Sequence, residues 1–260
     1  MGSCAPTPPS SKLSRLRKYE STLPPRTKTN RPVAIVPIIL AADSGHKIGF
    51  PRALATFGTK TALQIAFENC SALAPPVVVV SPKLARLLGG AAGALHERQI
   101  WQEDRPALDT PRILQEQRSA LLERRYSRLV VHQRGPRGQL GSLLAGLRLV
   151  PAEVPFMIYA VDYPLLTGAV VRRLVEAFKT RLARYSIVLP RYRGRAGHPV
   201  IFAPELRGEL AGAESARAVI YRDPRRVKFV TVRDSSISKD FDTPAAYRRV
   251  LREYLRRFGK

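Results

Sequence analysis

The chain has 260 residues, 45% of them hydrophobic, so it can bury the core of one large domain or of two small ones. It carries 44 basic and 20 acidic residues, a formal net charge of +24, but only two cysteines, which excludes a disulfide framework and a cysteine metal centre. No apolar run approaches the ~20 residues of a membrane span, and the N-terminus lacks the apolar segment of a secretory signal. We therefore expect a cytoplasmic α/β protein without a membrane partner.

The positive charge has two interpretations. Basic residues can neutralise the phosphates of a nucleic acid, or they can steer anionic small molecules toward a site. No basic stripe interleaved with aromatic residues stands out in the sequence. A solvated basic surface is therefore favoured, and nucleic-acid binding stays open as the less favoured interpretation.

The N-terminal segment differs from the rest of the chain. Residues 1–30 are rich in Pro, Ser, Lys and Arg and poor in apolar residues, which predicts a basic disordered tail. A single domain is expected over residues 31–260. Within it, residues 96–127 interrupt the pattern with a charged helical segment, and we interpret them as an insertion.

Apolar runs alternate with helical patterns from residue 33 onward. Runs such as VAIVPIIL (33–40), PPVVVV (75–80), VPFMIYAV (154–161) and SIVLP (186–190) are typical of strands, whereas TALQIAFENCSAL (61–73) and TGAVVRRLVEAFKTRLARY (167–185) have helical spacing. This alternation predicts a doubly wound α/β fold with a mostly parallel sheet and helices on both faces. Residues 191–204 suggest an antiparallel excursion, and residues 244–258 an amphipathic helix with a basic outer face.

Chemistry-bearing residues follow the strands. Ligands of open α/β sheets bind beyond the carboxyl ends of the strands. The first strand leads into a glycine-containing loop with Lys47 and Arg52, a later strand ends at Asp162, and Asp242 precedes the last helix. Cations near a glycine loop suit phosphates, and two carboxylates with phosphate oxygens suit Mg²⁺. Each acid could instead cap a helix or sit in a turn, with Thr243 as the alternative cap of the last helix.

Five segments, in order, resemble the MobA-like nucleotidyltransferases. They are ILAADSGHKIGFPRAL, GQLGSLLAGL, VDYP, YRGRAGHPVIF and KDFDTPAAY, which together cover roughly residues 33–250. The Gly-His-Pro element is most similar to the molybdenum cofactor cytidylyltransferase branch. The resemblance implies a Rossmann-like three-layer fold of the nucleotide-diphospho-sugar transferase type. It also implies an activity, the transfer of a nucleoside monophosphate from a nucleoside triphosphate, with CTP favoured, to a phosphorylated small molecule.

The resemblance also implies roles for individual residues. Lys47, Arg52 and Asp162 would be catalytic, and Asp162 with Asp242 would hold Mg²⁺. Gly197, His198 and Pro199 would bind the acceptor, although His198 could instead be a turn residue packed on Tyr192. The nucleotide would be bound by Leu40, Ala41, Ala42, Asp43, Gly45, Lys47, Gly49, Arg52 and Ser142, and Ser142 could instead be a helix N-cap.

The departures from the family pattern fall at charged positions. Lys47 and Arg52 exchange the family's arginine and lysine, and these side chains are not equivalent phosphate partners. Asp43 stands where the family has glycine, and Val161 replaces the glycine before Asp162. A carboxylate about 4 Å from a phosphate oxygen costs about 4 kcal/mol at an effective dielectric constant of about 20. The leading hypothesis is an active enzyme. The alternatives are a degenerate homologue that binds a nucleotide or a partner without turnover, and a basic nucleic-acid-binding protein.

Overall fold

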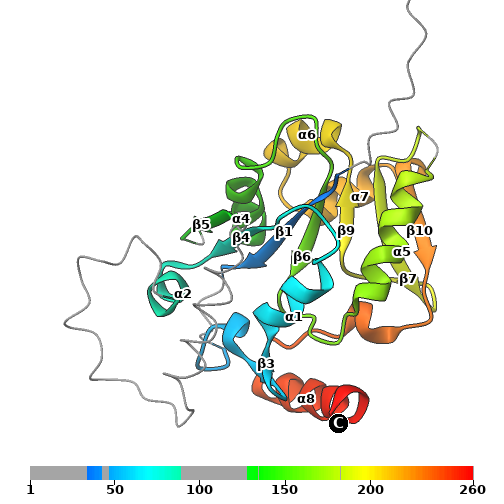
Figure 1. Cartoon of the computed structure of the whole chain (residues 1–260). Coiled ribbons are helices and arrows are strands. Elements are labelled where there is room, and N and C mark those ends of the chain that lie inside the picture. The colour runs from blue at the N-terminus through cyan, green and yellow to red at the C-terminus, as the bar shows by residue number, and fades with distance from the viewer. Residues whose placement is uncertain (1–33, 43–46, 89–127, 134, 182, 260) are drawn as a thin grey trace, which may run out of the picture. The chain divides into compact units, whose positions relative to one another are not determined.

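An eight-stranded mixed sheet forms the centre of the fold (Figure 1). The computed structural model describes residues 34–42, 47–88, 128–133, 135–181 and 183–259. The strand order is β10-β7-β9-β6-β1-β4-β5, and β8 pairs with β7. The strands of this sheet are β1 (Val36–Ala41), β4 (Val77–Val80), β5 (Arg128–Val131), β6 (Phe156–Ala160), β7 (Ile187–Tyr192), β8 (Arg195–Ala196), β9 (Val200–Phe202) and β10 (Val227–Thr231). A separate small hairpin joins β2 (Thr56–Phe57) to β3 (Lys60–Thr61).

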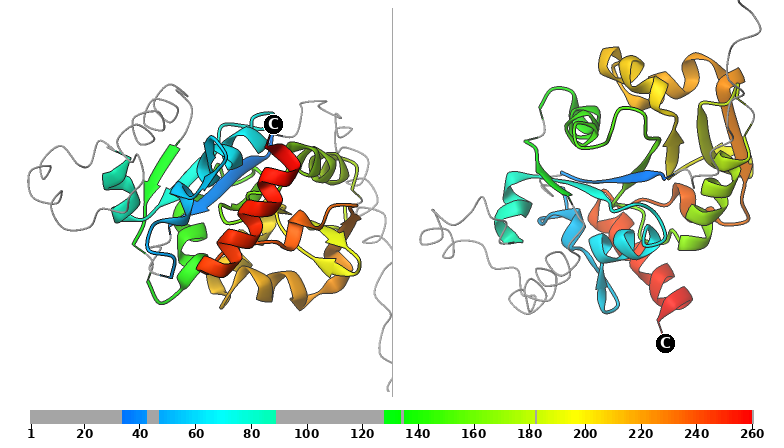
Figure 2. Two further views of the ribbon diagram at one scale, coloured as in Figure 1. Left: turned by 90° about the horizontal axis from the view of Figure 1, so that it is seen from below. Right: turned by 45° about the horizontal axis from the view of Figure 1, so that its top comes forward.

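Helices lie on both faces of the sheet (Figures 1 and 2). The helices are α1 (Ala62–Asn69), α2 (Pro82–Leu87), α4 (Gly138–Leu147), α5 (Gly168–Lys179), α6 (Arg207–Gly212), α7 (Ala216–Arg222) and α8 (Pro244–Phe258), with 3-10 turns η1 (Arg52–Leu54), η2 (Pro204–Leu206), η3 (Pro224–Arg226) and η4 (Ser235–Ser238). One core packs α1, α2, α5 and α8 on the sheet, and a second packs α4, α6 and α7 on the opposite face. The result is three layers.

The side chains of β1 alternate between the two cores. Ile39 and Ala41 belong to the core under α1 and α8, whereas Ile38 and Leu40 belong to the core under α4. Because neighbouring side chains of a strand point to opposite faces, a strand covered on both sides must be apolar throughout. This explains why every residue of β1 is buried. Cys70, at the end of α1, is a small residue of the first core and is only 1% exposed.

The predicted architecture is confirmed. Strand β1 pairs in parallel with β4 and β6, β4 with β5, and β7 with β10, so most of the pairing is parallel. The antiparallel excursion is also present, because β7 and β8 form a hairpin. Its two central residues, Arg193 and Gly194, have φ of 45° and 80°, as a type I′ turn requires. Helix α8 matches the predicted terminal helix.

Parts of the prediction fall outside the described residues. The expected tail, residues 1–30, and the expected insertion, residues 96–127, are among those the structure does not describe. Among the helices that it does describe, none combines the length and the apolar character needed to cross a membrane.

Gly146 allows α4 to lie close to the sheet. A Cβ atom there would lie 2.8 Å from the side chains of both Ile38 and Val79. We expect Gly146→Ala to lower the free energy of unfolding by about 1–3 kcal/mol, because packed cores resist added atoms. Gly208 in α6 has no neighbour within 4 Å of the same position, so Gly208→Ala should be neutral or stabilising by up to about 1 kcal/mol. Urea unfolding measures both, and equal effects would contradict the close approach.

Candidate active site

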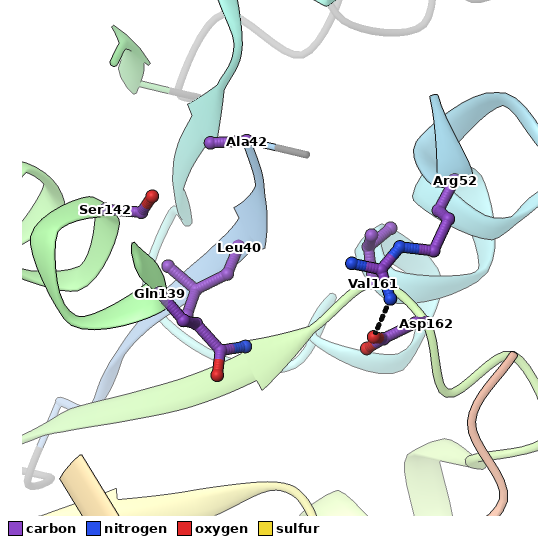
Figure 3. Close-up of a pocket in the computed structure, with 7 residues that line it drawn as sticks. All are labelled: Leu40, Ala42, Arg52, Gln139, Ser142, Val161 and Asp162. Atoms are coloured by element: carbon purple, nitrogen blue, oxygen red, sulfur yellow. Dashed lines mark hydrogen bonds and ion pairs between the residues drawn. The ribbon is translucent and has the colours of Figure 1, made fainter. Parts of the chain in front are cut away.

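A pocket opens at the carboxyl ends of β1 and β6 (Figure 3). Seven residues line it: Leu40, Ala42, Arg52, Gln139, Ser142, Val161 and Asp162. They come from four segments, which are β1, the turn η1, the start of α4 and the end of β6. The pocket therefore occupies the position where open α/β sheets bind ligands.

Strand β1 directs alternate residues toward the pocket. Leu40 and Ala42 line it, whereas Ala41 packs in the core on the opposite face and is 1% exposed. The β1 and β6 ends are joined beyond their last pair, because the Val161 amide donates a hydrogen bond to the Leu40 carbonyl at 3.2 Å. Leu40, Ala41 and Ala42 are all predicted to bind the nucleotide. Because the Ala41 side chain packs on the opposite face, Ala41 could contact a ligand in the pocket only through its backbone.

The pocket contains an ion pair between Arg52 and Asp162. Arg52 Nη1 lies 2.7 Å from Asp162 Oδ2, and the two side chains are 20% and 15% exposed. Arg52 opens the 3-10 turn η1 after Pro51, and its neighbour Ala53 is fully buried, which anchors the turn. Asp162 lies in the turn after β6, and the cap of the following helix is Thr167. The helix-cap interpretation of Asp162 is therefore wrong.

A second, more exposed pair joins Lys47 to Asp242. Their side chains approach to 3.4 Å and are 61% and 46% exposed. Asp242 does not cap α8, because the Thr243 side chain accepts the hydrogen bond from the Ala246 amide at 3.2 Å. Lys47 and Arg52 are only five residues apart, so both carboxylates lie beside the same short segment. The structure thus joins each predicted base to one predicted acid.

The start of α4 contributes Ser142 and Gln139. Ser142 is 3% exposed and lies inside the helix, which begins at Gly138, so the N-cap interpretation of Ser142 is wrong. Gln139 was not predicted. It stands three residues before Ser142, a spacing that places both side chains on one helical face, and that spacing could have identified it. Val161 was noticed only as a departure from the family pattern, and its side chain lines the pocket.

The Gly-His-Pro segment lies next to the pocket through Tyr163. The rings of His198 and Tyr163 are 4.7 Å apart between centroids and tilted by 37°, so the ring partner of His198 is Tyr163, whereas the alternative interpretation had named Tyr192. His198 Nδ1 is inaccessible to solvent and has no hydrogen-bond partner among the described residues. Burial lowers the pKa of His198 to about 4. Burial also raises the pKa of Tyr163, and the carboxylates of Asp162 and Asp240 add to that effect.

Gly197 and Pro199 shape the backbone on either side of His198. A Cβ atom on Gly197 would meet the Ile237 carbonyl oxygen at 2.1 Å, and the His198 amide donates to that same oxygen at 2.9 Å. Pro199 is buried and follows a cis peptide bond. Neither residue lines the pocket of Figure 3.

Of three further predicted loop residues, two lie outside the described part of the chain, and the third is described but does not line the pocket. Asp43 and Gly45 fall outside the described residues, so the structure does not test their predicted contacts with the nucleotide. Gly49 has a φ of 87°, a conformation that favours glycine, and lies in the turn that holds Lys47.

The donor set fits a hard divalent cation. The described residues hold no cluster of three or more His, Cys, Asp or Glu side chains that could enclose a metal ion. Mg²⁺ commonly takes one or two carboxylates, completing its shell with waters and substrate phosphates. Asp162 and Asp242 are carboxylates of the kind that such an ion accepts, and each lies beside a base of the segment from Lys47 to Arg52.

A largely buried carboxylate, a guanidinium and a helix start lie together at the carboxyl edge of a mostly parallel sheet, which is where open α/β proteins bind their ligands. The MobA-like NTP transferase domain model matches residues 37–227. The chain therefore belongs to the MobA-like NTP transferase family and is an enzyme of the nucleotidyltransferase type. The match covers the pocket segments, although Asp242 lies beyond it. No curated protein matches the sequence.

Solved structures share the fold at low sequence identity. Rv0371c from Mycobacterium tuberculosis H37Rv is 20% identical, with a TM-score of 0.64, over 85% of this chain and 99% of its own. Its complex with manganese gives a TM-score of 0.60, at 20% identity over 84% and 98%. The 4-diphosphocytidyl-2C-methyl-D-erythritol synthase of Anaerococcus prevotii is 13% identical, with a TM-score of 0.58 over 86% and 96%. Molybdopterin-guanine dinucleotide biosynthesis protein A of Archaeoglobus fulgidus is 16% identical, with a TM-score of 0.52 over 84% and 98%.

The two ion pairs should differ in their contribution to stability. We expect Arg52→Met to lower the free energy of unfolding by about 2 kcal/mol, because it removes a guanidinium 2.7 Å from the largely buried Asp162 carboxylate. Lys47→Met removes a solvent-screened pair and should cost at most about 1 kcal/mol. Urea unfolding at neutral pH measures both. A larger loss for Lys47→Met would contradict the difference in burial.

His198 should make stability depend on pH. Its pKa is lowered from 6.5 to about 4 in the folded chain, so the unfolded chain binds more protons between these values. Stability should therefore fall by about 1–3 kcal/mol as the pH drops from 6.5 to 4. We expect His198→Asn to reduce this slope in urea unfolding series. An unchanged slope would show that the ring remains hydrated in the folded protein.

Proposed function

We propose that this chain transfers a nucleoside monophosphate from a nucleoside triphosphate to a phosphorylated small molecule, with Mg²⁺ as cofactor and release of pyrophosphate. The observation that supports this most directly is the pocket that holds Arg52 and Asp162 together beside the start of α4. A guanidinium suits phosphate oxygens, a carboxylate suits the metal that accompanies them, and a helix start favours anions.

The residues of the pocket and of the Lys47–Asp242 pair have different roles in the transfer. A phosphate oxygen of the acceptor forms a bond to the α-phosphorus, and the bond from that phosphorus to the pyrophosphate oxygen breaks. Lys47 and Arg52 stabilise the charge that grows on the leaving pyrophosphate. Asp162 and Asp242 hold the metal, which when bound neutralises charge on the triphosphate. Leu40, Ala42 and Val161 form the apolar walls of the pocket that exclude water.

Nucleotide binding exchanges the partners of the two ion pairs. Without a ligand each base neutralises one acid, at 2.7 Å and 3.4 Å. A metal-bound triphosphate carries charges of both signs, so the bases can turn to the phosphates while the acids turn to the metal. The paired arrangement keeps four charged groups at one sheet edge without a net charge, and it provides the matching groups for a ligand that is itself a paired metal and polyphosphate.

The acceptor belongs on the side of Gly197, His198 and Pro199. His198 packs on Tyr163, which directly follows Asp162, so this segment borders the reacting groups. We favour CTP as the donor and a molybdenum-cofactor-type acceptor, on the strength of the Gly-His-Pro element. The fold shared with a diphosphocytidyl synthase and with a molybdopterin-guanine dinucleotide biosynthesis protein is consistent with that choice.

Pyrophosphate release tests the proposal. The full chain should release pyrophosphate from one of the four nucleoside triphosphates when Mg²⁺ and a panel of phosphorylated acceptors are present. Asp162→Asn should lower the rate by at least a hundredfold and weaken Mn²⁺ binding, followed by electron paramagnetic resonance. Glu176→Gln removes an exposed carboxylate of α5 outside the pocket and should change neither. Absence of release with every donor and acceptor would contradict the proposal.

Asp43→Gly separates an active loop from a degenerate one. Calorimetric titration of each triphosphate with Mg²⁺ should detect binding to the parent chain, and the glycine variant should bind with altered affinity. Binding that appears only in Asp43→Gly would favour the degenerate homologue.

A further inference from the structure

Helix α8 has one face without partners, and that face is basic. Arg248, Arg249, Arg252 and Arg256 are all exposed. Within the described part of the chain, none of the four forms a hydrogen bond or an ion pair with another side chain. At 100° per residue they occupy an arc of about 100° on the helix, so they form one stripe rather than a scatter. We call these four residues the α8 arginine stripe.

The opposite face of α8 is fixed to the domain. Ala246 and Val250 are buried, and Tyr247, Leu251 and Tyr254 pack against the same core. The Tyr247 hydroxyl donates a hydrogen bond to the Thr56 carbonyl at 2.8 Å. Figure 2, left, shows α8 lying across the near side of the molecule in the view from below. The stripe therefore points away from the core on a helix whose orientation is fixed.

Two bases on the inner side of α8 behave differently, Arg257 of the helix itself and Lys239 at the end of the preceding turn η4. Arg257 lies 3.1 Å from Asp234, and Lys239 lies 2.6 Å from Glu253. Acids are thus present next to the helix, but they neutralise the inward bases only. The helix dipole favours cations only in the last turn, so it accounts for Arg256 but not for Arg248 and Arg249.

We propose that the α8 arginine stripe binds the phosphate backbone of a nucleic acid without sequence specificity. Arg248, Arg252 and Arg256 recur every four residues and span about 12 Å along the helix axis. One strand of a duplex displays three or four phosphates over about 12 Å. Guanidinium groups bind phosphate oxygens through paired hydrogen bonds, and sequence-independent binding needs no contact with the bases.

A membrane surface fits this helix less well. A helix that lies in a membrane inserts its apolar face among the lipids. The apolar face of α8 is already buried in the domain, and only Leu255 and Phe258, which are 45% and 42% exposed, remain outside at its end. The free surface of α8 is suited to charge contacts with a polyanion.

The test uses full-length chains and a labelled 20-base-pair duplex, without nucleotide or metal. One variant changes all four stripe residues to glutamine. Its matched control changes four exposed arginines elsewhere, Arg148, Arg172, Arg173 and Arg217, so that both lose the same charge. Fluorescence anisotropy over a salt series gives the affinity and the salt slope, and thermal unfolding checks that both variants fold.

We expect the stripe variant to bind at least tenfold more weakly at ~100 mM salt, with a salt slope smaller by about three. The control should lose less than threefold. Equal losses in both variants, or tighter binding to vesicles containing anionic lipid than to the duplex, would overturn the proposal. The assay contains no triphosphate, so its outcome is independent of the transferase activity.

Discussion

The ion pair between Arg52 and Asp162 is the interaction on which the site depends. It joins residues 110 positions apart, one in a 3-10 turn after β1 and the other in the turn after β6. Both turns can meet because β1 and β6 are parallel neighbours with their carboxyl ends at the same sheet edge. The distance between the two charged groups is short and both are mostly buried, so each group fixes the position of the other. The same two groups are those to which we assign the contacts with the proposed metal-bound polyphosphate.

The architecture could be predicted from the sequence, because strands that are buried on both faces of a sheet are apolar throughout. The tetravaline run of β4 and the apolar run of β1 can exist only where helices cover both sides, and helical spacing in α5 and α8 identified two of those helices. The pocket residues Arg52 and Asp162 were predicted because residues that follow parallel strands converge at one edge, whereas Leu40, Ala42 and Ser142 were predicted only from the family resemblance. The order of the five family motifs strengthened the prediction of the pocket, because it relates segments that are far apart in the chain and that no local pattern connects.

Other features could not be predicted, because they depend on packing between segments. The contact of His198 with Tyr163 joins the start of β9 to the end of β6, which are neighbours in the sheet, and the sequence does not specify that strand order. The cap of α8 is Thr243 and not Asp242, a choice between two neighbouring oxygens that is settled by backbone geometry. Asp242 is thereby left to pair with Lys47. Gln139 was missed because an uncharged amide carries no distinctive signal of its own, and only its spacing of three residues from Ser142 indicates that both share a helical face.

The net charge of +24 indicates a binding surface only once the positions of the charged residues are known. Several bases that face inward are matched by acids, as with Arg226 beside Glu209 at 2.6 Å and Lys239 beside Glu253, and others, such as Lys228, donate to backbone carbonyls. Pairing of this kind supports the fold, because an unmatched charge near the core would lose its hydration without compensation. The outer side of α8 has no such constraint, since its residues touch water whatever their charge. Folding therefore does not require four arginines there, and their alignment on one fixed helix suits the polyanion that we propose as its partner.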